Sequence, residues 1–171
     1  MITEQTISMI NNMTTENVDN FPLLELLIKN GAPNLIQTVY ECAAKNKRYL
    51  IIEKLSKIGL QDNALTYLVN RQEDKFNELK QIDLITSTRC FEYIMASNLL
   101  ITKTKVQKII SISPQISIYD FNLIKSLFND EEREKIIIDK VQCEFTKKMI
   151  KAFNEQLKIV EEEEKKFIDS I

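Results

Sequence analysis

The sequence predicts an all-α domain of stacked antiparallel helix hairpins with a long amphipathic helix in its C-terminal part. Apolar residues recur every three or four positions along most of the 171-residue chain, as on the buried faces of helices. Only two glycines and three prolines occur, which leaves few of the tight turns that β-hairpins need. Short polar or glycine-containing breaks separate the periodic segments, so consecutive helices should pack as antiparallel pairs.

The first 20 residues are expected to form a capping helix and a linker within a single domain, 1–171. Ile7 to Met13 make a weak amphipathic stretch, and a mostly polar run extends to Asn20. Pro22 suits the first turn of a following helix, and Gly31 is the expected stop of that helix. Residues 21–128 are predicted to form the hairpin stack.

Within the stack, each hairpin is predicted from two apolar periodic segments separated by a short break. Asn46 is expected to close one helix in the left-handed conformation, and Thr86 or Ser87 to cap another. A short helix, 119–128, is expected to complete the stack. The paired segments are 35–46 with 49–58, 63–69 with 76–82, and 86–99 with 103–112.

Residues 129–171 are predicted to form the long helix. Asn129 to Glu132 provide an acidic start that suits the positive end of a helix dipole. Apolar residues from Ile138 to Val160 then follow helical spacing, so one face should be covered. An unbroken helix would be about 60 Å long, so its end should project. The tract from Glu161 to Lys166 is interpreted as a solvated surface.

The residues that usually carry enzyme chemistry are scarce. The chain has no histidine, CxxC pair, glycine-rich phosphate loop or EF-hand spacing, so we predict no catalytic, cofactor-binding or metal-binding residue and no enzyme activity. The three cysteines, Cys42, Cys90 and Cys143, are far apart in the sequence, and an odd number cannot all form disulfides within the chain. They are interpreted as reduced, buried small hydrophobes.

Charge and hydropathy restrict the expected partners. The net charge of −2 provides no global basic field, so nucleic acid is not an expected partner. Two basic clusters, Lys45–Arg48 and Lys103–Lys108, are interpreted as solvated helix turns. No apolar run approaches the roughly 18 residues of a membrane span, and the first residues do not resemble a secretion signal. A cytoplasmic location is therefore expected.

One part of the sequence resembles ankyrin repeats. Residues 24–34 resemble the end of a repeat's second helix with its turn; 39–46 and 49–60 resemble the first and second helices of the next repeat. Degenerate repeats could continue to residue 112. The threonine-proline-leucine-histidine opening is missing, and Gly31 and Gly59 are 28 residues apart rather than about 33. A divergent helical bundle or another helical-hairpin repeat would show the same periodicities.

This resemblance implies a non-enzymatic module that binds another protein. Divergent ankyrin-like proteins of viruses and intracellular bacteria often act on host proteins, so a host cytoplasmic partner is one expectation. One alternative is an assembly protein that forms homo-oligomers through its C-terminal helix. Another is a viral-type bundle that holds a partner's helix in a groove. The expected partner contacts are residues in or near two turns: Ala32, Pro33, Asn34, Tyr40, Arg48, Gln61, Asp62 and Asn63.

Overall fold

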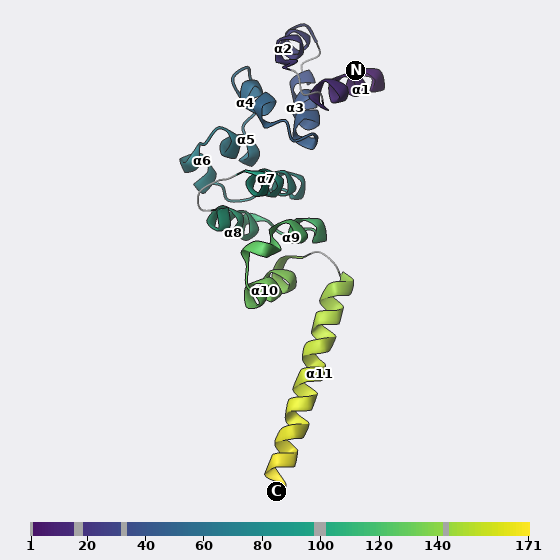
Figure 1. Ribbon diagram of the computed structural model, residues 1–171, viewed down its shortest axis with the longest axis vertical. Helices are drawn as coiled ribbons and strands as arrows, with labels where there is room; N and C mark the ends of the chain where they lie inside the picture. Colours follow the sequence, from purple (N-terminus) through teal and green to yellow (C-terminus); the bar gives the residue numbers. More distant parts are fainter. Residues whose placement is uncertain (1, 16–18, 32–33, 98–101, 142–143) are drawn as a thin grey trace.

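The computed structural model describes residues 2–15, 19–31, 34–97, 102–141 and 144–171. Helices stack along the long axis of the molecule, and the last helix extends beyond the stack (Figure 1). The described residues form eleven α-helices and one 3₁₀ helix, without a named β-strand, which confirms the all-α prediction. The helices are α1 Glu4–Thr15, α2 Phe21–Asn30, α3 Leu35–Lys45, α4 Tyr49–Ser56, α5 Ala64–Val69, α6 Glu73–Asn77, α7 Leu84–Ala96, α8 Thr102–Ile112, α9 Ile118–Ile124, η1 Lys125–Leu127, α10 Asp130–Lys140 and α11 Glu144–Asp169.

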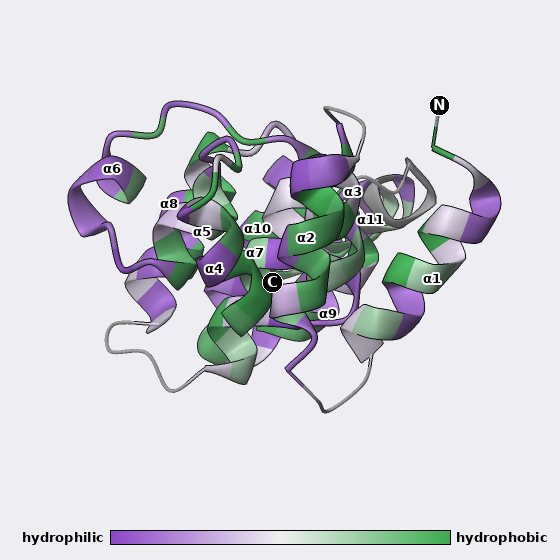
Figure 2. Ribbon diagram, turned by 90° about the horizontal axis from the view of Figure 1, so that it is seen from above, coloured by the Kyte–Doolittle hydropathy of each residue, from purple (hydrophilic) through white to green (hydrophobic). Residues whose placement is uncertain are grey.

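Helix α1 packs against α3 at the side of the stack, near the end that α2 occupies (Figure 1). The Asn46 amide at the end of α3 donates hydrogen bonds to Thr14 Oγ1 at 2.7 Å and to Asn11 Oδ1 at 3.0 Å. Thr14 and Ile10 are completely buried in this contact region. In the view along the stack, α1 and α6 lie on opposite sides (Figure 2).

Gly31 ends α2 as predicted, but it does so in an extended conformation with φ −102° and ψ −170°. Its role is therefore steric. A Cβ atom at this position would lie 2.4 Å from Leu35 Cδ2 and 2.6 Å from the Leu27 carbonyl oxygen. Both distances are far shorter than a carbon contact at van der Waals separation. Glycine is needed here because the chain passes close to its own helices.

The two turns inside the first two hairpins have the same backbone geometry. Lys47 (φ 57°) follows α3 and Arg71 (φ 56°) follows α5, and both are left-handed. Each turn has hydrogen bonds of 3.2 and 2.8 Å from two successive amides to carbonyls in the preceding helix, the pattern of a Schellman motif. The left-handed residue is thus Lys47 and not Asn46, which has φ −90°. The Asn46 side chain is instead used in the contact with α1.

The middle hairpin is short, since α5 has six residues and α6 has five. Asn63 and Thr66 form a capping box that fixes the start of α5. Helix α7 has thirteen residues and begins after Asp83, whose carboxylate accepts a 2.8 Å hydrogen bond from the Thr86 amide. The predicted cap at Thr86 or Ser87 is therefore wrong by about one turn, because an acidic side chain upstream provides the acceptor.

The predicted continuous helix of residues 129–171 is interrupted. Helix α10 ends at Lys140, and Val141 is extended with φ −73° and ψ 123°. Val141 forms an isolated parallel bridge with Ile116, in which the Ile116 amide donates to the Lys140 carbonyl at 2.8 Å. Both Val141 and Ile116 are buried. Helix α10 is linked to the stack by this bridge and by the Lys103–Glu132 ion pair, so the amphipathic C-terminal helix is α11 alone.

A continuous apolar core runs through the stack. Its fully buried large side chains include Leu24, Ile52, Phe76, Phe91 and Ile109, which come from five different helices. Within the described residues, no helix has both the length and the hydropathy of a bilayer span.

Candidate interaction surface

The predicted contact residues in the two turns are only partly available to a partner. Ala32 and Pro33 lie outside the described residues. Asn34, Gln61 and Asp62 are exposed before α3 and α5. Asn63 is the N-cap of α5, and its side-chain oxygen accepts hydrogen bonds from two backbone amides of that helix. The exposed residues of these turns remain possible contacts, whereas the Asn63 oxygen is already used for capping.

Tyr40 is not an exposed contact, because only 3% of it is accessible to solvent. Its hydroxyl donates to Asn63 Oδ1 at 3.4 Å, and the Arg89 guanidinium carbon lies 5.6 Å from its ring centroid. Burial raises the pKa of Tyr40, although Arg89 opposes this effect. Arg89 also forms an ion pair with Glu41. Tyr40 therefore joins α3, the α5 cap and α7, which is a structural role that the sequence pattern did not reveal.

Arg48 lies away from the predicted turn surface. It follows the C-terminal end of α3, whereas Asn34 precedes the N-terminal end. A helix of eleven residues is about 16 Å long, so the two positions belong to different edges of the stack. The predicted set is thus not a single patch. Arg48 instead belongs to a surface around the start of α4.

We call this surface the Tyr49 face; its charged, aromatic and exposed apolar residues are Lys47, Arg48, Tyr49, Leu50, Glu53, Lys54, Lys57, Arg71 and Tyr93. Three elements bring it together: the first hairpin, the α5–α6 turn and α7. The rings of Tyr49 and Tyr93 meet edge to face, with centroids 4.7 Å apart and planes at 68°. Lys47 pairs with Glu92 of α7 at 3.3 Å. These contacts connect α7 directly to the α3–α4 hairpin, beside the short α5.

Two hollows flank Tyr49 and Leu50. One, of about 520 Å³, lies between Asp19–Asn20 and the start of α4. The other, of about 550 Å³, lies between α4, the α5–α6 turn and Tyr93. Leu50 lines both hollows and is 63% exposed, so its side chain is available to a partner at the point where the hollows meet. Burial, assisted by the nearby Glu92 charge, raises the pKa of Tyr49 to about 12, so Tyr49 stays a neutral donor.

The Tyr49 face has an excess of positive charge. Lys54 pairs with Asp19 at 3.1 Å, and Lys47 with Glu92. Lys57 and Arg71 are exposed, and neither takes part in an ion pair among the described residues. The face therefore combines five cations, which outnumber the carboxylates of Glu53 and the adjoining Asp19, with two tyrosines and an exposed leucine. Such a combination suits a partner segment with acidic and apolar side chains.

The second basic cluster serves the stack itself. Lys103 pairs with Glu132 of α10 at 3.0 Å, and Lys105 pairs with Glu73 of α6. The Lys105 side chain is only 12% exposed, so it is not the solvated residue that its sequence context suggests. The sequence alone indicates that the first cluster, Lys45–Arg48, lies at the surface. It does not indicate that Arg71 and Tyr93 belong to the same surface, because they are distant in sequence from Tyr49.

The buried polar groups connect helices. The hydroxyls of Ser87 and Ser113 lie 2.9 Å apart between α7 and the end of α8. Asp120 is completely buried, and Thr88 donates a 2.7 Å hydrogen bond to its Oδ1. Desolvation raises the pKa of Asp120, and no hydrogen bond reaches its Oδ2 within the described structure. Burial also raises the pKa of the thiols of Cys42 and Cys90, whereas Cys143 lies outside the described residues.

In the described part of the chain, no three acidic or cysteine side chains gather as metal ligands would. No protein-family model matches the chain, nor does any curated protein or solved structure. The surfaces of the stack and of α11 are therefore the features from which a function can be proposed.

Proposed function

We propose that this chain is a non-enzymatic, ankyrin-like binding module that uses the Tyr49 face to hold an acidic, partly apolar segment of another protein. The observation that carries the proposal is the exposed Leu50 between two hollows, bordered by cations. An apolar side chain of the partner would enter a hollow beside Leu50. Acidic side chains of the same segment would meet Lys57 and Arg71.

The repeated turn supports a module built of successive helix hairpins, with an interval shorter than the about 33 residues of an ankyrin repeat. Lys47 and Arg71 occupy equivalent left-handed positions in successive hairpins, 24 residues apart in the sequence. A left-handed non-glycine residue costs roughly 1–2 kcal/mol, so the surrounding hydrogen bonds must hold each turn in place. Successive hairpins then present basic side chains from the same edge. Repeat proteins bind partners through such rows of equivalent positions.

The test compares binding of two designed peptides to the full-length protein. One peptide carries glutamates around leucine and phenylalanine, and the other has lysines in place of the glutamates. We expect the acidic peptide alone to bind, by fluorescence polarisation, and to bind at least about tenfold more weakly to the Lys57→Glu/Arg71→Glu variant. Lys80→Glu/Lys125→Glu, which makes the same charge change at exposed positions elsewhere, should bind like the unaltered protein.

A Leu50→Ser variant tests the apolar part of the surface separately. Because Leu50 is exposed, its replacement should leave the fold intact by circular dichroism and weaken acidic-peptide binding. Equal binding by the Lys57/Arg71 variant and its charge-matched control would refute the proposed surface. Binding of the basic peptide instead would refute the proposed partner chemistry.

A further inference from the structure

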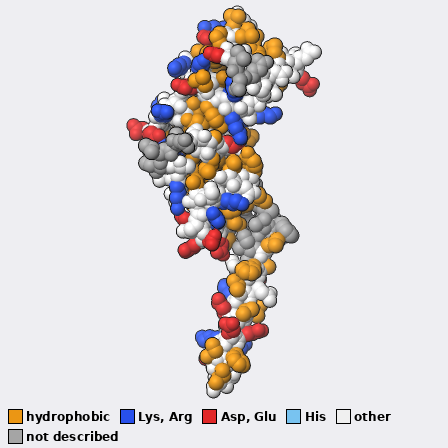
Figure 3. Space-filling model, viewed as in Figure 1, with side chains coloured by type: hydrophobic (Ala, Val, Ile, Leu, Met, Phe, Trp, Pro, Cys, Tyr) orange, Lys and Arg blue, Asp and Glu red, His pale blue; other side chains and the backbone are white. Residues whose placement is uncertain are grey.

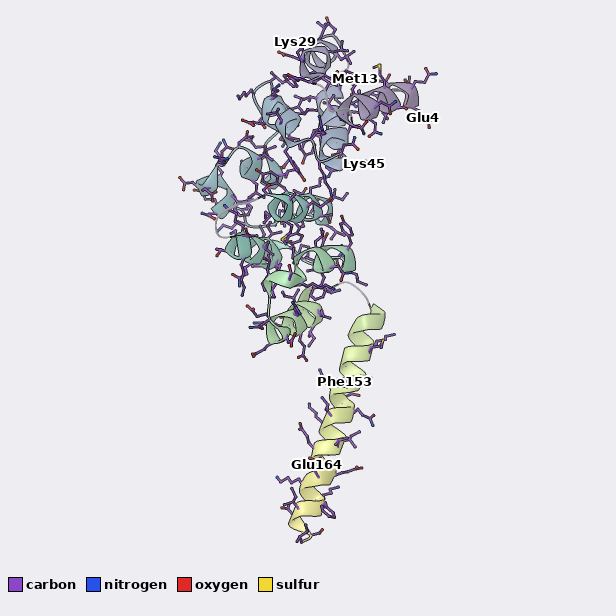
Figure 4. All side chains as sticks on the ribbon, in the orientation of Figure 1. Glu4, Met13, Lys29, Lys45, Phe153 and Glu164 are labelled. Carbon is purple, nitrogen blue, oxygen red and sulfur yellow. The ribbon has the colours of Figure 1, made fainter. Side chains whose placement is uncertain are left out.

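Helix α11 presents an uncovered apolar stripe. It extends beyond the stack, and exposed hydrophobic and acidic side chains alternate along it (Figures 1 and 3). Phe153 and Glu164, labelled in Figure 4, both lie on the part that is clear of the stack. Phe153 and Phe167 are 65% and 68% exposed, so these rings have little protein around them. Exposed rings at this spacing usually mark an interface.

The stripe has the spacing of a coiled-coil seam. Phe153, Val160 and Phe167 are seven residues apart, and Leu157 and Glu164 are also separated by seven. With 100° of rotation per residue, these five positions and Met149 fall within an arc of about 80°. The α11 seam, as we call these six residues, is therefore narrow and continuous. A narrow stripe fits another helix better than it fits a broad surface.

We infer that the α11 seam binds the α11 seam of a second copy of this chain in antiparallel orientation. Because both copies have the same sequence, their seams are equally long and can pair along the whole of α11, which has 26 residues and a length of about 39 Å. The association does not depend on the proposed function. If both hold, the dimer carries one Tyr49 face at each end, because each stack adjoins the N-terminal end of its own α11.

The charge distribution along the helix selects the orientation. Residues 144–158 carry four lysines and two glutamates, whereas residues 159–171 carry five acidic residues and two lysines. A parallel pair would place Glu164 against Glu164 and the whole acidic tract against itself, which is destabilising. An antiparallel pair places each acidic half against the basic half of the other copy. Only the antiparallel arrangement gives electrostatic complementarity.

The exposed side chains of the seam supply part of the area that a specific interface needs. A phenylalanine buries at least about 150 Å² in full, so four rings that are now two-thirds exposed would bury about 400 Å² in the pair. The smallest stable interfaces bury roughly 1,200 Å² in total. Met149, Leu157 and Val160 of both copies, with the polar residues beside the seam, are available for the remaining area.

Light scattering of the full-length protein across a concentration series tests the association. We expect a dimer, and Leu157→Lys should raise its dissociation constant at least about tenfold, because the half-exposed Leu157 side chains of both copies are lost from the interface. Ile159→Lys is the matched control: Ile159 is 50% exposed, Leu157 is 45% exposed, and Ile159 lies away from the seam. A monomer at all concentrations, or equal effects of the two variants, would overturn the association.

Amine cross-linking of mixed normal and ¹⁵N-labelled protein tests the orientation. Mixed-isotope cross-links between Lys148 or Lys151 and Lys165 or Lys166 are expected for the antiparallel pair. Links between Lys166 of one copy and Lys166 of the other would instead show a parallel pair and overturn the inferred orientation. The Lys57→Glu/Arg71→Glu variant should dimerise normally, and the Leu157→Lys variant should still bind the acidic peptide. Failure of the two proposals is therefore distinguishable.

Discussion

Asp120→Asn is expected to stabilise the protein at neutral pH and to remove part of its pH dependence. Asp120 is completely buried in α9, where desolvation raises the pKa of its carboxyl above the ordinary value of 3.8. Thr88 donates to one oxygen, but the other has no hydrogen-bond partner among the described residues. Leaving a buried polar atom unpaired costs roughly 1–3 kcal/mol. The amide also leaves one group unpaired, so the substitution recovers only the additional cost of burying a charge, and we expect a gain of about 1 kcal/mol.

The sign of the pH dependence follows from the raised pKa. Between pH 3.8 and the higher pKa of the folded state, the folded protein holds more protons at this site than the unfolded chain. The contribution of Asp120 to stability therefore falls as pH rises through this window. Below it, the carboxyl is protonated in both states, and the difference between Asp120→Asn and the unaltered protein should be smallest.

Urea denaturation, followed by circular dichroism at a series of pH values, measures this difference. Asp139→Asn removes an exposed carboxyl from α10 and serves as the control for net charge. If the unaltered protein gained stability relative to Asp120→Asn as pH rose above 3.8, the assigned burial of a costly carboxylate would be wrong. If Asp120→Asn and Asp139→Asn increased the free energy of unfolding equally, the effect would come from the change in net charge and not from the burial of Asp120.

Substitutions at three further positions test the backbone and its caps, each by the free energy of unfolding in urea. Arg71→Gly should stabilise by about 0.5 kcal/mol, since it relieves a left-handed residue at φ 56°, and Arg71→Val should destabilise. Gly31→Ala should cost about 1–3 kcal/mol, because its Cβ would lie 2.6 Å from the Leu27 carbonyl; no loss would contradict the close approach. Asn63→Ala should cost about 1 kcal/mol and Asn63→Asp much less, because only alanine removes the cap of α5.

Local signals in the sequence located most of the helices. The break at Gly31 and the acidic start at Asn129–Glu132 mark helix ends through chemistry that acts within a few residues. The cap of α7 was misplaced by about one turn, because Asp83, Thr86 and Ser87 are all able to cap and only the backbone decides among them. The left-handed residue after α3 was displaced by one position for the same reason, since the Schellman hydrogen bonds select Lys47.

The candidate surface was harder to predict than the fold. The basic cluster at Lys45–Arg48 is visible in the sequence, but its neighbours on the Tyr49 face come from the next hairpin and from α7. Tyr40 was expected among the partner contacts only because of its position near the predicted turns. Its position in α3 fits either role, and burial beneath Arg89 depends on how α7 packs.

The sequence by itself determined that this chain is helical, where most helices begin and end, and that its C-terminal part carries an amphipathic stripe. These properties follow from periodicity and from capping residues, which act over one or two turns. The tertiary structure alone decided that the stripe is divided at Val141. No strong helix breaker marks this position, since neither glycine nor proline occurs from Ile136 to Glu144. The helix ends because burial of Val141 beside Ile116 from a distant segment outweighs the continuation of regular hydrogen bonds.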